Sequence, residues 1–178
     1  MARLEGPSYL SVWVSRARVA GGEAERRAMN EFRFSMVDGP PPDCPGKIVE
    51  REIPSDLALV APLVIRTVEA LAEKGVLQRG DEHSVCLCLE EALRNAVLHG
   101  NRQEFSKRVR LVAFSEGSDL GFLVSDEGGG FDPTSLRSPV RTERLVEETG
   151  RGVFLICSFM DRVAYYRGGS ALLMTRRL

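Results

Sequence analysis

An acidic and an amide side chain lie one helical turn apart in residues 90–100. Glu91 and Asn95 project from the same side of a predicted helix, and His99 continues their row at its end. A carboxylate beside a carboxamide suits a site that needs one proton acceptor and one neutral oxygen ligand for a metal ion. Such pairs are also common on the polar side of amphipathic helices, and this segment alone favours that simpler interpretation.

A second segment places an aspartate at the end of an apolar run, directly before a group of glycines. Asp126 is followed by Gly128 and Gly130. Glycine lets the backbone approach a ligand and adopt positive φ, and a carboxylate accepts a hydrogen bond from a ligand amino group. A tight turn explains the same residues. The segment has neither the lysine of a Walker A loop nor the following helix of a Rossmann motif.

A third segment opens an apolar helix with two glycines. Gly150 and Gly152 flank Arg151, and the predicted helix covers 153–160. The N–H groups and the dipole at a helix N-terminus favour a phosphate, and Arg151 adds positive charge. The alternative is an ordinary helix that follows a loop and has Thr149 as its N-cap.

Composition narrows the classes of function. The chain has 178 residues, 24 Lys and Arg against 25 Asp and Glu, and a formal net charge of −1. This balance argues against a general attraction to nucleic acid or acidic membranes. The chain has neither a long uncharged apolar run nor the pattern of a secretion signal, so we expect a cytoplasmic protein. The four cysteines lack the spacing of a zinc site, and we expect reduced thiols.

The elements that must position the three segments alternate between strands and helices. Apolar runs and turn signals predict strands at 47–53, 109–115, 120–125, 162–167 and 170–176, of which the second and third form one hairpin and the last two another. Two helices are predicted before the second segment, one from Ser55 as N-cap to Gly75 with an interruption at Pro62, and one from Asp81 as N-cap to about Leu98, which carries Glu91 and Asn95. The apolar residues that recur at helical spacing on this second helix form a stripe that should face the core, namely Val85, Leu89, Ala92, Leu93 and Ala96. This pattern predicts an α+β fold, a two-layer sandwich with a mixed, mostly antiparallel sheet covered by helices on one face.

The N-terminal part is harder to interpret. Residues 38–46 are rich in Pro and Gly and mark a boundary, so we expect an extension at 1–46, of unknown role, and one domain at 47–178. Strand-like alternation occurs at 9–14, and 23–30 has the composition of a short charged helix. An added strand, a dimer contact and a loose tail all remain open for this extension.

The order of the three segments is more specific than any one of them. Acid-x3-Asn, then Asp-x-Gly-x-Gly, then Gly-x-Gly before a helix resembles the three nucleotide-binding boxes of the GHKL ATPase superfamily. Residues 91–100, 150–156 and 159–161 are most similar to the anti-sigma-factor serine/threonine kinases of sporulation and stress control. The resemblance covers about 47–178 and implies the Bergerat ATP-binding fold.

The resemblance also implies a role for each matching position. Glu91 corresponds to the general base for the acceptor serine, and Asn95 to a nucleotide-binding residue that also holds Mg²⁺. Asp126 corresponds to the carboxylate that accepts from the adenine amino group. The other positions matched to nucleotide binding are His99, Gly128, Gly130, Thr149, Gly150, Arg151 and Gly152. Residues 133–149 correspond to a lid over ATP, in which Arg137, Arg141 and Arg144 are candidates to reach the phosphates.

The implied activity is an ATP- and Mg²⁺-dependent serine/threonine kinase. Such an enzyme phosphorylates an anti-anti-sigma partner, sequesters a sigma factor and forms a homodimer, without direct contact to nucleic acid or membrane. Arg66 is matched to a partner-binding arginine. The alternative is an ATP-binding regulatory module that gates a protein interaction without turnover. The catalytic domain of a histidine kinase is disfavoured, because His83 and His99 both lie inside the ATP-binding part.

Two positions depart from the pattern of the sporulation kinases. Glu148 stands where they carry a basic residue before the Thr-Gly-x-Gly step. Ser170 and Ala171 stand where their last strand offers a threonine near adenine. Neither departure affects Glu91, Asn95 or Asp126, so we expect an unchanged set of catalytic groups. We expect either a weaker nucleotide affinity or substitution by other arginines of the lid.

Overall fold

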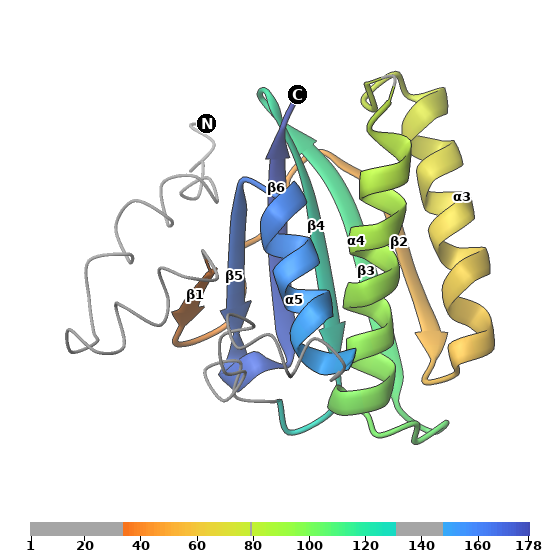
Figure 1. Ribbon diagram of the computed structural model, residues 1–178, viewed down its shortest axis with the longest axis vertical. Coiled ribbons are helices and arrows are strands. Elements are labelled where there is room, and N and C mark those ends of the chain that lie inside the picture. Colours follow the sequence, from red (N-terminus) through yellow and green to blue (C-terminus); the bar gives the residue numbers. More distant parts are fainter. Residues whose placement is uncertain (1–33, 79, 131–147) are drawn as a thin grey trace, which may run out of the picture.

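One sheet with helices on a single face makes up the described part of the protein. The computed structural model describes residues 34–78, 80–130 and 148–178. Within these ranges the strands form one six-stranded sheet in the order β1-β5-β6-β4-β3-β2. Helices α3, α4 and α5 lie together on one face of it (Figure 1). This confirms the predicted α+β sandwich.

The sheet is antiparallel except at one edge. Its strands are β1 (Phe34–Val37), β2 (Lys47–Pro54), β3 (Arg108–Glu116), β4 (Asp119–Asp126), β5 (Arg162–Tyr166) and β6 (Ala171–Arg177). The predicted hairpins β3–β4 and β5–β6 are both present. β1 pairs in parallel with β5, and a strand this short has too few residues for a recognisable alternation. The elements expected at 9–14 and 23–30 lie outside the described residues.

The helices bury the apolar stripes that the sequence indicated. α3 covers Val60–Glu73, α4 covers Glu82–Asn95, and α5 covers Glu148–Phe159. All members of the stripe expected on the second helix are buried, namely Val85, Leu89, Ala92, Leu93 and Ala96. They pack with residues of β3, β4 and β6 into one core between the helices and the sheet. This burial, at about 25 cal/mol per Å² of apolar surface, anchors α4 against the sheet.

The start of the first helix differs from the prediction. Asp56 caps a 3-10 turn, since its side chain accepts from the backbone N–H of Ala58, and α3 follows directly. Ser55, the predicted N-cap, is buried instead, and its Oγ donates to the carbonyl oxygen of Val97 at 3.5 Å. Pro62 lies in the first turn of α3, where a missing backbone N–H leaves no helical hydrogen bond unmade.

The second helix starts at its predicted N-cap but uses it differently. The Asp81 carboxylate makes no cap hydrogen bond and pairs with Arg176 Nη2 at 2.7 Å. Arg176 Nη1 also donates to Ser84 Oγ at 2.9 Å. These contacts tie the end of β6 to the beginning of α4. The helix ends in a π-helical turn at Ala96–Gly100, a deviation that recurs at functional sites.

Residues 38–46 connect β1 at one edge of the sheet with β2 at the other and pass across the face opposite the helices (Figure 1). The Gly39 carbonyl oxygen accepts from the Arg167 N–H, and the Gly46 carbonyl oxygen accepts from the Ser115 N–H. A second apolar cluster lies on this face, made of Cys44, Val112, Phe114, Leu123, Ala164, Tyr166, Ala171 and Leu173. The Pro- and Gly-rich segment thus packs against the sheet.

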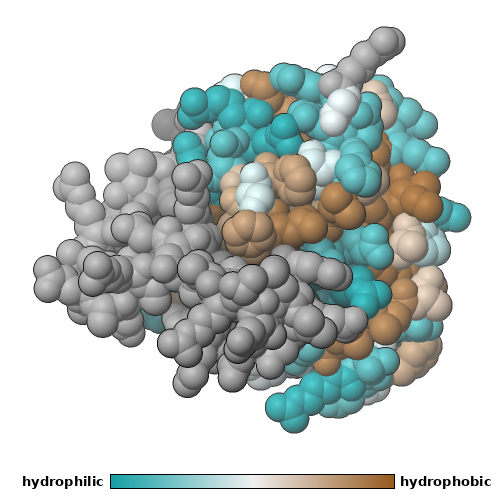
Figure 2. All heavy atoms as spheres, in the orientation of Figure 1, coloured by the Kyte–Doolittle hydropathy of each residue, from teal (hydrophilic) through white to brown (hydrophobic). Residues whose placement is uncertain are grey.

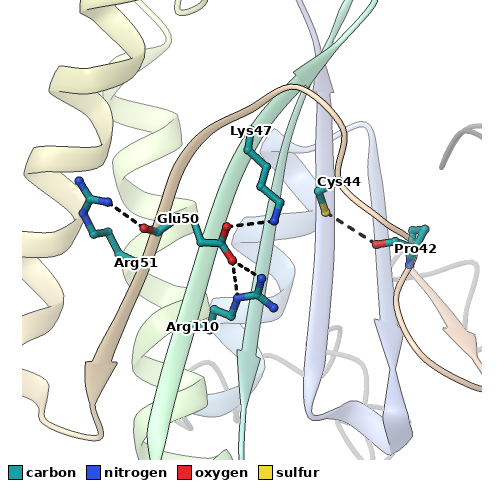
Figure 3. A network of polar contacts seen from close by, with 6 residues as sticks. All are labelled: Pro42, Cys44, Lys47, Glu50, Arg51 and Arg110. Carbon is teal, nitrogen blue, oxygen red and sulfur yellow. Dashed lines mark hydrogen bonds and ion pairs between the residues drawn. The ribbon is translucent and has the colours of Figure 1, made fainter.

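The edge strand β2 and its neighbour β3 carry exposed charged side chains that pair with one another. Glu50 accepts from Lys47 Nζ at 2.9 Å and from the Arg110 guanidinium (Figure 3). The hydrogen bond from Arg110 is the main reason that the pKa of Glu50 is lowered. Arg51 Nη1 donates to the Glu50 carbonyl oxygen at 2.8 Å. Exposed ion pairs add little stability, but charged edge strands resist pairing with other chains.

The helix-covered face also exposes aromatic side chains. Phe154 and Phe159 of α5 are 51% and 41% exposed. Figure 2 shows hydrophobic surface gathered over α5 in this view. None of the helices in the described ranges has the length and apolar run needed to cross a bilayer.

Candidate functional site

The first and third segments meet where α4 packs against α5. Gly152 is buried, and a Cβ atom built on it would lie 2.4 Å from Glu91 Oε2 and 3.6 Å from Asn95 Nδ2. A real Cβ does not approach another heavy atom to 2.4 Å, so this contact requires glycine or a displaced Glu91. The structure therefore brings Glu91, Asn95 and the beginning of α5 together.

The second segment meets the end of the first. Asp126 is the last residue of β4, and its Oδ1 accepts from the Gly128 N–H at 2.8 Å. A Cβ on Gly100 would lie 2.4 Å from Asp126 Oδ2, and a Cβ on Gly128 would lie 1.9 Å from the Gly100 carbonyl oxygen. Glycine at both positions thus lets the π-helical turn and the Asp126 loop pack directly against each other.

A small cavity lies between the first segment, the second segment and the β5–β6 hairpin. It is lined by Ala92, Asn95, Ala96, Val124, Asp126, Tyr165, Gly169, Ser170 and Leu172. Its walls are mostly apolar, with one carboxamide and one carboxylate among them, which suits a flat aromatic ligand that carries an amino group. Its volume is about 20 Å³, room for roughly one water molecule. A purine would therefore have to widen the cavity on binding.

Burial tunes the carboxylate in this cavity. The pKa of Asp126 is raised to about 6, mainly because burial disfavours the charged form. The hydrogen bond from the Gly128 N–H and the charge of Lys107 act in the opposite direction. At neutral pH Asp126 is therefore mostly ionised, and its charge opposes folding until a ligand donor compensates it.

The last hairpin closes one side of the site. The Asp126 N–H donates to the Ser170 carbonyl oxygen at 3.0 Å, which holds the end of β4 against the start of β6. Gly130 has a φ of +76°, and a Cβ there would lie 2.1 Å from the Gly168 carbonyl oxygen. Ser170, which replaces the expected threonine, donates its hydroxyl to the Arg167 carbonyl oxygen at 3.2 Å. That hydroxyl is thus engaged within its own turn.

The remaining predicted residues lie around this centre. His99 is exposed in the π-helical turn. Thr149, Gly150 and Arg151 are helical, because α5 already begins at Glu148. The helix start expected at 153 was wrong, and Thr149 follows the first helical residue instead of capping it. The segment 133–147 with its three arginines lies outside the described residues.

Sequence reasoning missed two residues that organise the site. Gly100 ends the matched segment 91–100 without a predicted role, and Asn101 lies outside that segment. Asn101 is fully buried. A buried polar side chain almost always has hydrogen-bond partners, so its side chain is expected to organise its surroundings. The sequence signal for these two residues is the pair Gly-Asn directly after His99. A helix that ends there leaves its last backbone carbonyl groups without helical hydrogen bonds, and nearby residues must supply other partners.

The side-chain oxygens at the site fit a magnesium ion that is held mostly by water and by ligand phosphates. Among the described residues, no group of three or more His, Cys, Asp and Glu side chains is arranged to hold a metal. Asn95 offers one neutral oxygen, half-exposed beside Glu91. Mg²⁺ commonly keeps several waters and takes one or two protein ligands together with substrate phosphates. The arrangement therefore suits an ion that arrives with a phosphorylated ligand.

Comparison with known proteins agrees with this geometry. Residues 53–176 match the model of the histidine kinase-like ATPase domain. Over 136 residues the chain is 26% identical to serine-protein kinase RsbW of Staphylococcus aureus strain bovine RF122 / ET3-1, which covers 72% of this chain and 85% of that protein. The RsbW proteins of strains MSSA476 and JH9 show the same identity and coverage. The resemblance to the GHKL ATPase superfamily is thereby confirmed, and the chain belongs to the family of histidine kinase-like ATPase domains.

Proposed function

We propose that this protein is an ATP-dependent serine/threonine kinase that acts as an anti-sigma factor. It phosphorylates a serine of an anti-anti-sigma partner and sequesters a sigma factor. The observation that carries the proposal is the convergence of the three segments: Gly152 lies against Glu91 with no room for a side chain, and Asn95 shares a cavity with Asp126. Similarity to serine-protein kinase RsbW supports the choice of a serine acceptor.

Asp126 recognises the base in this proposal. Its Oδ1 already accepts from the Gly128 N–H, which leaves Oδ2 to accept from the adenine amino group. Val124, Tyr165 and Leu172 contribute apolar walls for the faces of the ring. Burial makes this hydrogen bond stronger than it would be in water, because water competes less for the carboxylate.

The phosphates extend from the base toward the first turn of α5. Backbone N–H groups at a helix N-terminus favour phosphate oxygens, and Gly150 and Gly152 allow a close approach. Asn95 is the protein ligand for Mg²⁺, which when bound neutralises charge on the triphosphate. His99, Thr149 and Arg151 belong to the proposed nucleotide site through their match to the family pattern.

Glu91 acts as the general base. Its carboxylate takes the proton of the acceptor serine hydroxyl while the serine oxygen forms a bond to the γ-phosphorus. The bond between that phosphorus and the β–γ bridging oxygen breaks, and ADP leaves. Phosphoryl transfer depends mainly on positioning and charge stabilisation, so the contact between Gly152 and Glu91 is central to the arrangement.

The partner surfaces belong to the same proposal. Arg66 is exposed on α3 at a groove of about 360 Å³ between α3 and β2, whose apolar walls include Val49, Ile53 and Leu63. Phe154 and Phe159 give α5 an exposed apolar surface of the kind that binds other proteins. We further propose a cytoplasmic homodimer with a kinase domain at 47–178, whose sheet is completed at one edge by β1 of the extension at 1–46.

Nucleotide titration and a transfer assay test this function. We expect calorimetry to show ATP binding that weakens when Mg²⁺ is chelated. Incubation with γ-labelled ATP and candidate anti-anti-sigma proteins should place the label on a serine of one of them. ATP binding without transfer to any candidate would favour the regulatory module. Absence of ATP binding would contradict both functions.

Substitution of Gly152 separates stability from catalysis. We expect Gly152→Ala to leave stability unchanged or raise it by up to about 1 kcal/mol, because alanine is the better helix former. The new Cβ would displace the flexible end of Glu91, whose Oε2 lies 2.4 Å from its position. Transfer should then fall by about 10-fold or more, since misplacing a catalytic group is costly. Thermal unfolding and transfer rates measure the two effects, and unchanged transfer would contradict the role of this contact.

A further inference from the structure

A closed ring of hydrogen bonds links Asn101, Arg108 and Glu127, the residue that follows Asp126. Asn101 Nδ2 donates to the Arg108 carbonyl oxygen at 2.9 Å, and Asn101 Oδ1 accepts from the Glu127 N–H at 3.0 Å. The Arg108 N–H donates to Glu127 Oε2 at 2.7 Å and closes the ring. The ring thus joins the end of the π-helical turn, the beginning of β3 and the loop after β4.

Asn101 is the buried centre of this ring. Its side chain is fully buried, whereas Glu127 is exposed. The Asn101 N–H donates to the Ala96 carbonyl oxygen at 2.8 Å, so the backbone of Asn101 ends the π-helical turn while its side chain reaches the next segments. Water cannot easily replace the amide at a fully buried position. Loss of the side chain would leave the Glu127 N–H and the Arg108 carbonyl without these partners.

The ring controls the backbone on one side of Asp126. The Asp126 N–H is held by the Ser170 carbonyl oxygen, and the next N–H, that of Glu127, is held by Asn101. The carboxylate itself lies against Gly100, the neighbour of Asn101, with no room for a side chain between them. The direction of Asp126 Oδ2 therefore depends on Asn101 through its bond to Glu127 and through the placement of Gly100.

We propose that Asn101 is a positioning residue that sets the discrimination between purine bases by fixing the direction of the Asp126 carboxylate. This inference rests on the proposed nucleotide binding. Asn101 does not line the cavity and acts only through Asp126. A hydrogen bond to the adenine amino group tolerates little misdirection, and a site built around it rejects a base that presents a carbonyl oxygen there.

The test compares ATP with inosine triphosphate, which carries an oxygen in place of the adenine amino group. Calorimetry gives the two dissociation constants for the full chain, and their ratio is the discrimination. We expect wild type to prefer ATP by about 100-fold or more, because a mismatched buried acceptor is strongly unfavourable. In Asn101→Ala the ratio should fall by about 10-fold or more, mainly through weaker ATP binding.

A matched control separates positioning from loss of stability. Leu120→Ala removes a fully packed side chain at the other end of β4 and lowers stability without touching the ring. Its discrimination should equal that of wild type. If the alanine variant does not fold, Asn101→Ser replaces it in the experiment, because serine keeps a polar group at this position. The expected loss of discrimination is the same.

The outcomes distinguish the inference from the function beneath it. Wild type that discriminates strongly, together with Asn101 variants that retain the full ratio, would overturn the role of Asn101 and leave the proposed function standing. An equal loss of discrimination in Leu120→Ala would also overturn it, since a general loosening would then suffice. Wild type that binds neither nucleotide would overturn the proposed function, and this inference with it.

Discussion

Replacing Asp126 with asparagine is expected to stabilise the free protein at neutral pH and to weaken ATP binding by about 100-fold or more. Asparagine keeps an oxygen that can accept from the Gly128 N–H, so the loop retains its hydrogen bond. Its amino group would face the adenine amino group, donor against donor. The same substitution removes a buried charge that opposes folding.

The stability gain should depend on pH in a defined direction. The pKa of Asp126 is about 6 in the folded protein, above its ordinary value of 3.8. Between these values the native state holds a proton that the unfolded state has lost, so wild-type stability falls as pH rises through this window. The gain in Asp126→Asn should be near zero below pH about 4 and reach a plateau above about 7. We expect about 1–2 kcal/mol there, because solvent screens the partly exposed carboxylate.

Urea unfolding at several pH values and ATP titration at pH 7.5 measure the two effects. Asp161→Asn is the matched control, because the Asp161 carboxylate accepts from the Arg177 N–H and is exposed. The Asp161→Asn variant should bind ATP as tightly as wild type and show no comparable gain in the free energy of unfolding. Asp126→Asn that binds ATP at full strength would exclude Asp126 as the base-recognising group.

Replacing Glu91 with glutamine is expected to reduce phosphoryl transfer by about 10²- to 10⁴-fold, the usual contribution of a general base. Glutamine has the same shape and can keep the contact with Gly152, but it cannot take a proton from serine at neutral pH. ATP affinity should change by about 3-fold at most, since the proposed base and phosphate contacts do not involve this carboxylate.

The neighbouring glutamate provides the control. Glu90 is exposed on the same turn of α4 and carries the same charge, whereas Glu91 is half-buried against α5. Glu90→Gln should transfer phosphate at the wild-type rate. Equal transfer by wild type and Glu91→Gln would mean that another group accepts the proton, or that Glu91 only positions the serine.

The sequence by itself determined the fold class and the family. Apolar periodicity identified α4 and its buried face, because a stripe at helical spacing must be covered. Turn glycines and apolar runs identified the hairpins β3–β4 and β5–β6. The order of Glu91, Asn95, Asp126 and the glycines resembles that of the GHKL boxes, and this resemblance predicts a nucleotide site. Each of these features depends on residues close together in the sequence, so the sequence pattern alone can predict it.

Only the tertiary structure decided which of these residues touch. Gly152 against Glu91 and Gly100 against Asp126 are contacts between segments far apart in the chain, and no pattern within one segment encodes such distances. The same holds for Asn101, whose two side-chain partners lie on β3 and after β4. The Ser55 cap was wrong for this reason, since its hydroxyl bonds to Val97 across the fold. Long-range packing outweighs local preference wherever a buried polar group must find a partner, and that partner is chosen by the assembled fold.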